Sequence, residues 1–256
     1  MTVCESDDVT AVIDSLSPPG PAKPPRPIHR DGAVFVATFQ AASIAPWLSD
    51  VGLFNSGSIR SAVVRCSAFV SLRRPFPEVL CLAVKLSADT GDTGIGHDGE
   101  VQDLLFFSSF ARLHANAFPS GRWRAEGTQF SSAMSYRVGD QRILFGARMP
   151  RRSPARSTVE EGVRSRIASR ILQMQNPASA STQLQGILSG PGSELEIVTA
   201  TPGGRWWHAG TLSGFTSYGP WGDSVRFRRG HTCPELALTR FGAWRDGVYR
   251  YVQARP

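Results

Sequence analysis

The chain has 256 residues, of which 41% are hydrophobic and 19% charged, and it carries a formal net charge of +7. This length suits one sizeable domain or two small ones with an ample core, and the composition is that of an ordinary soluble protein. No apolar run is long enough to span a bilayer, and the first residues lack the basic-then-apolar order of a signal peptide. We therefore expect a cytoplasmic protein that does not associate with membranes.

The positive charge raises the question of nucleic-acid binding, because Lys and Arg supply the electrostatic part of such binding. The arginines are spread along the chain, with clusters at Arg148–Arg156 and Arg226–Arg229, and no zinc-finger, helix-turn-helix or RNP pattern accompanies them. A solvated basic surface is the better interpretation. The cysteines show no C-x-x-C spacing, and Cys66 and Cys81 lie in apolar segments, which predicts inert buried thiols.

The N-terminal segment, Met1–Pro25, is expected to be a disordered tail, because its SPPGPAKPP stretch can form neither a ladder nor a helix. A single ordered domain is then predicted over Arg26–Pro256. Its first stretch, RPIHRDGAVFVATFQ, predicts an extended entry, a turn at the Asp-Gly pair and a strand over Val34–Phe39. The histidine before this strand, His29, suits either a structural or a functional role.

The next stretch, VVRCSAFVSLRRPFPEVLCLAVKL (Val63–Leu86), contains two apolar runs joined by a basic, proline-flanked turn, and it predicts a hairpin. The first run alternates, so Arg65 and Ser67 share one face while the other face is apolar. A buried arginine and a buried hydroxyl are costly unless they meet a partner. Two interpretations stay open: a core hairpin whose Arg65 reaches solvent, or a pocket wall that presents Arg65 to an anion.

The rest of the chain predicts further strands and two helices, joined by polar segments. Strands are expected in VQDLLFFSSF, on both sides of the Val138–Gln141 turn within Gly121–Arg151, and in a hairpin formed by Glu194–Thr201 and Arg205–Leu212. Helices are expected at Ser157–Asn176 and Phe241–Gln253, and loops or linkers at Ala41–Ile59, Ser87–Glu100 and Ser179–Gly192. Because these helices do not alternate with the strands, a doubly wound parallel sheet is not favoured.

Two side-chain pairs in the C-terminal half allow more than one interpretation. The adjacent Trp206 and Trp207 suit packing at the rim of a barrel, or a platform for a carbohydrate or a base. Arg245 and Tyr249 stand one helical turn apart and so share a face of the predicted C-terminal helix. By itself this spacing fits an ordinary packed tyrosine as well as a functional pair.

Three segments resemble catalase-like haem proteins in the expected order: RPIHRDG, the VVRCSAFVSLRRPFPEVLCLAVKL hairpin, and RDGVY. The hairpin is similar to the V-R-F-S segment of that family and to the Pro-Asp-Val-Leu-Gly-Leu-Ala run of its short members. The resemblance extends loosely from Arg26 to Gln253. It implies an α+β fold, namely a largely antiparallel closed β-barrel of catalase type with a few flanking helices.

The resemblance also implies haem b as the cofactor and assigns residues that bind it. Tyr249 would bind the iron as a tyrosinate, and Arg245 would stabilise this anion, because a tyrosine pKa near 10 must be lowered for ligation. Arg26 and Arg65 would each pair with a haem propionate through charge-assisted hydrogen bonds.

Two catalytic residues are implied on the opposite side of the haem. His29 would accept a proton from peroxide and return it to the departing oxygen, and Ser67 would hydrogen-bond to His29 or to water. Full-length catalases also place an asparagine from a D-L-V-G-N segment over the iron. The matching positions here are Phe106, Phe107 and Ser108, so the amide is absent. This departure implies that dismutation of peroxide is weak.

The sequence therefore predicts a haem-dependent oxidoreductase that reduces hydrogen peroxide or an organic peroxide with a small organic donor. Two alternatives stay open. One is a catalase-fold haem enzyme that transforms an organic substrate, and the other is a haem-less barrel whose arginines bind another anion. The chain is shorter than full-length catalases and lacks much of what they use to assemble tetramers, which favours a small homo-oligomer.

Overall fold

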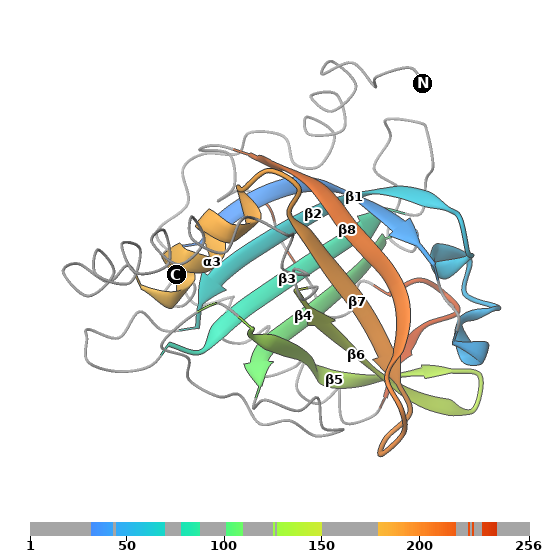
Figure 1. The fold of residues 1–256 in the computed structure, drawn as a ribbon. Coiled ribbons are helices and arrows are strands. Elements are labelled where there is room, and N and C mark those ends of the chain that lie inside the picture. Colours follow the sequence, from blue (N-terminus) through green and yellow to red (C-terminus); the bar gives the residue numbers. More distant parts are fainter. Residues whose placement is uncertain are drawn as a thin grey trace, which may run out of the picture.

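The computed structural model of the chain describes residues 32–42, 45–69, 78–87, 101–109, 125, 127–149, 179–218, 225, 227 and 232–239. These residues form a closed barrel of eight strands with one added short strand, and one α-helix lies beside it (Figure 1). The elements are β1 (Ala33–Ala41), β2 (Ile59–Ala68), β3 (Leu80–Ser87), β4 (Val101–Ser109), β5 (Gln129–Val138), β6 (Gln141–Arg148), α3 (Ala180–Leu188), β7 (Glu194–Ala200), β8 (Trp207–Ser217) and β9 (Ala237–Leu238).

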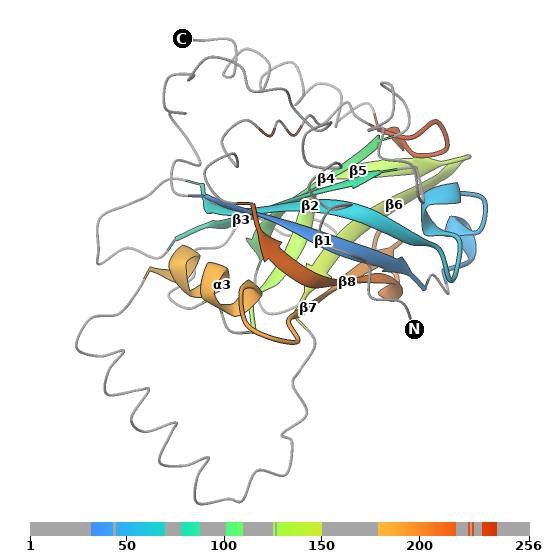
Figure 2. The same cartoon turned by 90° about the horizontal axis from the view of Figure 1, so that it is seen from above.

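The barrel is built from neighbouring antiparallel strands that follow one another in the sequence. Each of β1 to β7 pairs with the next strand, and the circle closes because β8 pairs with β1 (Figure 2). The short β9 adds to β5. The predicted largely antiparallel closed barrel with few helices is confirmed, and the first hairpin, β2–β3, has the alternation that the sequence predicts.

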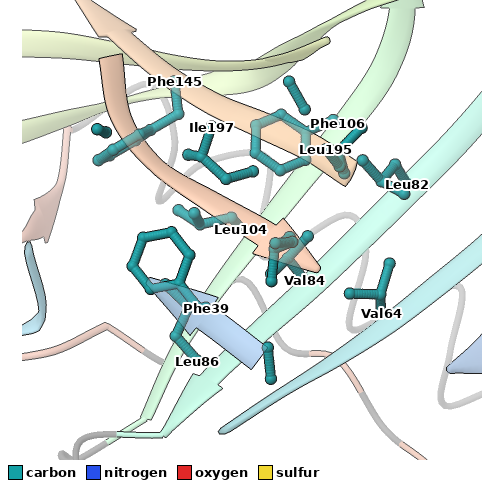
Figure 3. Packing of buried hydrophobic residues seen from close by; sticks show 14 of the residues in the cluster. Phe39, Val64, Leu82, Val84, Leu86, Leu104, Phe106, Phe145, Leu195 and Ile197 are labelled. Atoms are coloured by element: carbon teal, nitrogen blue, oxygen red, sulfur yellow. The ribbon is translucent and has the colours of Figure 1, made fainter. Parts of the chain in front are cut away.

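The core fills the inside of the barrel. Side chains from β1, β2, β3, β4, β6 and β7 point toward one another there (Figure 3), because every second residue of a strand faces the same side. The residues in the centre are almost completely buried and include Phe39, Val64, Leu82, Val84, Leu86, Leu104, Phe106, Phe145, Leu195 and Ile197. The side chains of the alternate residues in each strand therefore face outward.

Tight turns join the strands at the places that the sequence predicts. Gly139 has a φ of 54° in the turn between β5 and β6, and Gly203 has a φ of 75° between β7 and β8. Both positions favour glycine, because a residue with a Cβ rarely adopts a positive φ. The predicted loop at Ala41–Ile59 contains two short 3-10 turns, Pro46–Leu48 and Gly52–Phe54.

The predicted linker at Ser179–Gly192 is wrong, because α3 lies within it. Ser179 caps this helix: its side-chain oxygen accepts a hydrogen bond from the Thr182 N–H at 3.1 Å. Leu184 and Leu188 are one turn apart and fully buried against the barrel core. This segment is rich in small polar residues, as linkers are, but it contains a short amphipathic helix.

Replacing Ser179 with Ala is expected to lower the free energy of unfolding by about 0.5–2 kcal/mol, because the cap of α3 is lost. Chemical denaturation followed by circular dichroism measures this difference. Ser56→Ala is the matched control, since Ser56 is exposed and lies in a turn outside the helix. Equal losses in the two variants would contradict the capping role.

Of the two adjacent tryptophans, Trp207 packs at one end of the barrel. Trp207 contacts Trp47 edge to face, with ring centroids 6.2 Å apart, and it packs against the core cluster. The Trp47 Nε1–H donates a hydrogen bond to Thr199 Oγ1 at 3.2 Å. For Trp207 these contacts favour the packing interpretation over a carbohydrate or base platform.

Several sequence predictions fall outside the described residues. These are the tail at Met1–Pro25 and the helices at Ser157–Asn176 and Phe241–Gln253. Within the part of the chain that the structure describes, no helix is both long and apolar enough to cross a bilayer.

Candidate site on the outer face of the barrel

The outward-facing side chains of β1 to β4 form three rows. We call these three rows, together with Phe69, the outer-face site. The register of the strands aligns them across the sheet. In the order β2, β3 and β4, the first row is Ser67, Cys81 and Phe107, and Gly32, directly before β1, lies beside Ser67. In the order β1, β2, β3 and β4, the other two rows are Val34, Arg65, Ala83 and Leu105, and Val36, Val63, Lys85 and Asp103. Polar and charged side chains thus lie among apolar ones on this outward face of the barrel.

Arg65 is buried in this site, with 4% of its surface exposed. Its guanidinium lies over Gly32: a Cβ added to Gly32 would stand 2.6 Å from Arg65 Nε and 3.0 Å from Nη2. A side chain at position 32 would therefore have to displace the guanidinium. The interpretation in which Arg65 reaches solvent is wrong, since the packing of the outer face encloses it.

Ser67 lies next to this guanidinium. It is 3% exposed, and its Cβ would be 3.1 Å from the same added Cβ on Gly32. The structure therefore brings together the arginine and the hydroxyl that the sequence predicts on one face. Both border the start of β1, directly after the segment that contains His29 in the sequence.

Two buried thiols flank Arg65 on opposite sides of the sheet. Burial raises the pKa of the Cys66 thiol to about 12, although the Arg65 charge acts in the opposite direction. Burial also raises the pKa of Cys81, and the Arg65 charge again opposes the shift. Both thiols are therefore protonated at neutral pH, which agrees with the prediction of inert buried cysteines.

A buried ion pair lies in the third row of the site, between Lys85 and Asp103. Lys85 Nζ lies 2.8 Å from Asp103 Oδ1 and 3.0 Å from Oδ2, and the Asp103 side chain is completely buried. Lys85 Nζ also lies 5.6 Å from the centre of the Phe227 ring. This pair was not predicted from the sequence, although Lys85 stands at an outward position of β3, two residues after Ala83.

The opposite edge of the site is aromatic. Phe69 and Phe107 meet edge to face, with ring centroids 5.8 Å apart and an interplanar angle of 78°. Phe106 faces the core, and Ser108 Oγ accepts a hydrogen bond from the Leu80 N–H at 3.0 Å. Of the three positions that match the catalase asparagine, Phe107 is therefore the one that faces the site.

The remaining predicted site residues, Arg26, His29, Arg245 and Tyr249, lie outside the described residues. Among the residues that the structure does describe, no group of three or more His, Cys, Asp or Glu side chains is arranged to hold a metal ion. The part of the predicted site that can be placed is thus Arg65 and Ser67, together with the glycine that accommodates them.

Gly32→Ala is expected to lower the free energy of unfolding by roughly 1–3 kcal/mol, because the added methyl overlaps the Arg65 guanidinium. Urea denaturation measures the loss. Gly52→Ala is the control, since an added Cβ there has no atom within 4 Å. Similar stability of the two variants would show that the space over Gly32 is not filled in solution.

The sequence matches no protein-family model and no curated protein. Solved structures do match the fold. Catalase A from Saccharomyces cerevisiae is 11% identical with a TM-score of 0.58, and the match covers 91% of this chain and 61% of that one. A fungal catalase is 12% identical with a TM-score of 0.53, and a bacterial catalase is 11% identical with a TM-score of 0.55. These two matches also cover 91% of this chain, with 60% and 57% of the respective catalases. The chain thus spans about three fifths of the length of these catalases, and at these identities the likeness shows that it has the catalase fold.

Proposed function

We propose that this chain is a haem-binding, catalase-like protein that uses peroxide to oxidise a small organic donor and dismutates peroxide weakly. The observation that carries the proposal is the buried Arg65 guanidinium, which lies beside Ser67 on the outer face of a barrel with the catalase fold. A carboxylate is the natural partner of a buried guanidinium, and haem b carries two of them.

The described residues fit haem b in their chemistry. Arg65 and Lys85 give the outer-face site two cations, and Asp103 gives it one carboxylate, so these groups together carry a net charge of +1 that suits an anionic ligand. Apolar side chains stand beside Arg65 in the register of the sheet: Val34 and Leu105 lie in its row, and Val63 lies in the next row. Such side chains suit a flat apolar ring system.

Arg65 and Arg26 would hold the propionates of the haem, and Tyr249 would bind its iron as a phenolate. Arg245, one helical turn before Tyr249 in the predicted helix, would favour this ionised form. When bound, the haem iron supplies the redox chemistry that cleaves the O–O bond of peroxide.

The chain's own part in catalysis would be to move one proton. His29 precedes Gly32 by three residues, and three residues span at most about 10 Å. The backbone of His29 would therefore lie within this distance of Gly32, which lies beside Ser67. His29 would take a proton from the inner peroxide oxygen and deliver it to the leaving oxygen, and Ser67 would orient His29 or a water. In the overall reaction, hydrogen peroxide and a donor AH2 give two molecules of water and A.

The weak dismutation follows from Phe107. Dismutation requires a second peroxide to be held and oxidised, and a phenyl ring offers it no hydrogen bond where full-length catalases offer an amide. An organic donor needs no such polar partner at this position. The balance between the two reactions therefore shifts toward oxidation of a donor.

Purified wild-type protein supplied with haem is expected to show a Soret band, and Tyr249→Phe is expected to lose it or shift it strongly. Tyr251→Phe is the control, because Tyr251 lies in the same predicted helix but lacks an arginine four residues earlier. Equal spectra for the two variants would rule out Tyr249 as the ligand.

The activity is tested by comparing oxygen release with oxidation of a dye donor in the haem-loaded protein. We expect dye oxidation to exceed oxygen release, and His29→Ala to lower peroxide turnover by about a hundred- to ten-thousand-fold. Vigorous oxygen release without dye oxidation would contradict the proposal. A wild-type protein with no Soret band would instead favour a barrel whose buried arginine binds another carboxylate.

A further inference from the structure

Phe69 and Phe107 form an apolar wall at one edge of the outer-face site. Phe107 stands in the same row as Ser67 and Cys81, and Phe69 follows Ser67 by two residues. Neighbouring strands lie about 4.8 Å apart, so the base of Phe107 is roughly 10 Å from that of Ser67, two strands away. The wall is thus within one small molecule's length of the hydroxyl and the guanidinium.

Both rings of this wall are only half-buried, although Phe106, the neighbour of Phe107 on β4, is fully buried in the core. Leu105, the outward neighbour of Phe107 on β4, is half-buried as well. The wall therefore keeps apolar surface that an apolar ligand could cover. An aryl group gains from such a surface in two ways, by burial and by edge-to-face ring contacts.

We propose that this wall selects the peroxide, so that the site takes an organic hydroperoxide with an aryl or branched alkyl group in preference to hydrogen peroxide. The inference rests on the proposed function. Hydrogen peroxide is small and polar, and two phenyl rings give it neither a donor nor an acceptor. In the reaction the O–O bond breaks, the hydroperoxide ROOH leaves as ROH and water, and the donor AH2 supplies the two electrons and two protons and becomes A.

If the wall contacts the organic group of the peroxide, the protein should also bind the apolar alcohol product when no turnover takes place. Cumyl alcohol, the product of cumene hydroperoxide, is titrated into haem-loaded protein and its dissociation constant is measured by calorimetry. Phe107→Ala is expected to weaken binding by about tenfold or more, because the ring contact and its buried area are lost. Phe215→Ala is the matched control: Phe215 is also half-buried and makes an edge-to-face contact, with Phe35, with centroids 6.2 Å apart.

The second measurement is the ratio of kcat/KM for cumene hydroperoxide to kcat/KM for hydrogen peroxide. Phe107→Asn places an amide where the ring was, and we expect it to lower this ratio by about tenfold or more. Phe69→Leu, which keeps an apolar group but removes the ring, is expected to lower it less. An unchanged ratio in Phe107→Asn, or equal alcohol binding in Phe107→Ala and Phe215→Ala, would overturn the proposal.

The two proposals fail in different ways. If the wild type shows a normal Soret band but prefers hydrogen peroxide, the selective wall is wrong and the proposed function stands. If haem-supplied wild type shows no Soret band, the proposed function is wrong and the inference falls with it.

Discussion

Replacing Arg65 with Met is expected to weaken haem binding strongly while the barrel stays folded. Truncating one partner of a buried charge pair costs roughly 2–5 kcal/mol, which corresponds to about 30-fold to several thousand-fold in the dissociation constant. Methionine fills a similar volume without a charge, so the haem-free protein keeps its packing. Haem transfer to a stronger acceptor, followed at the Soret band, measures the affinity.

The control for this variant is Arg60→Met. Arg60 lies on the same strand, β2, and its Nη2–H donates to the Gly52 carbonyl at 3.2 Å, away from the outer-face site. We expect this variant to lose some stability and to keep its haem affinity. Equal haem affinity in Arg65→Met and wild type would show that Arg65 does not hold a propionate, and the proposed function would lose the observation that carries it.

The second large effect is expected for Asp103→Asn, which should lower the free energy of unfolding by about 3–5 kcal/mol. The new side chain has nearly the same shape but no charge, so the Lys85 ammonium remains buried without its carboxylate. Burying a charge without a counter-charge is far more costly than losing an ordinary hydrogen bond. Urea denaturation of the haem-free variants measures the loss.

Two further variants separate charge from packing. In Lys85→Met/Asp103→Leu both charges are removed, and we expect stability within a few kcal/mol of wild type or above it, because the desolvation penalty disappears with the pair. Glu196→Gln breaks a different ion pair, Arg148–Glu196, whose side chains are 44% and 24% exposed, and it should cost less than about 1 kcal/mol. A small loss in Asp103→Asn, similar to that in Glu196→Gln, would contradict the burial of the pair.

The orientation of Arg65 and Ser67 was predictable because it is a local property of the chain. Alternate residues of a strand face opposite sides, so both residues had to share a face once β2 was recognised. The hairpin of β2 and β3 was predictable for the same reason. The prediction that these two residues belong to one site needs no information from distant parts of the chain.

The short helix α3 could not be predicted in this way. A helix of nine residues is marginal by itself, and the small polar residues around it resemble a linker. Part of its support comes from far away in the sequence, because the Glu78 carboxylate accepts a hydrogen bond from the Ser181 N–H at 2.9 Å. Leu184 then finds its partner surface on the barrel core.

By itself, the sequence determined the strands, their tight turns and the face on which Arg65 and Ser67 lie, because these depend on spacing and on local backbone conformation. Only the tertiary structure decided that Arg65 is buried over Gly32, that Lys85 meets Asp103, and that Phe107 rather than its neighbours faces the site. These three facts depend on the register between strands and on the closure of the barrel, which join residues distant in sequence.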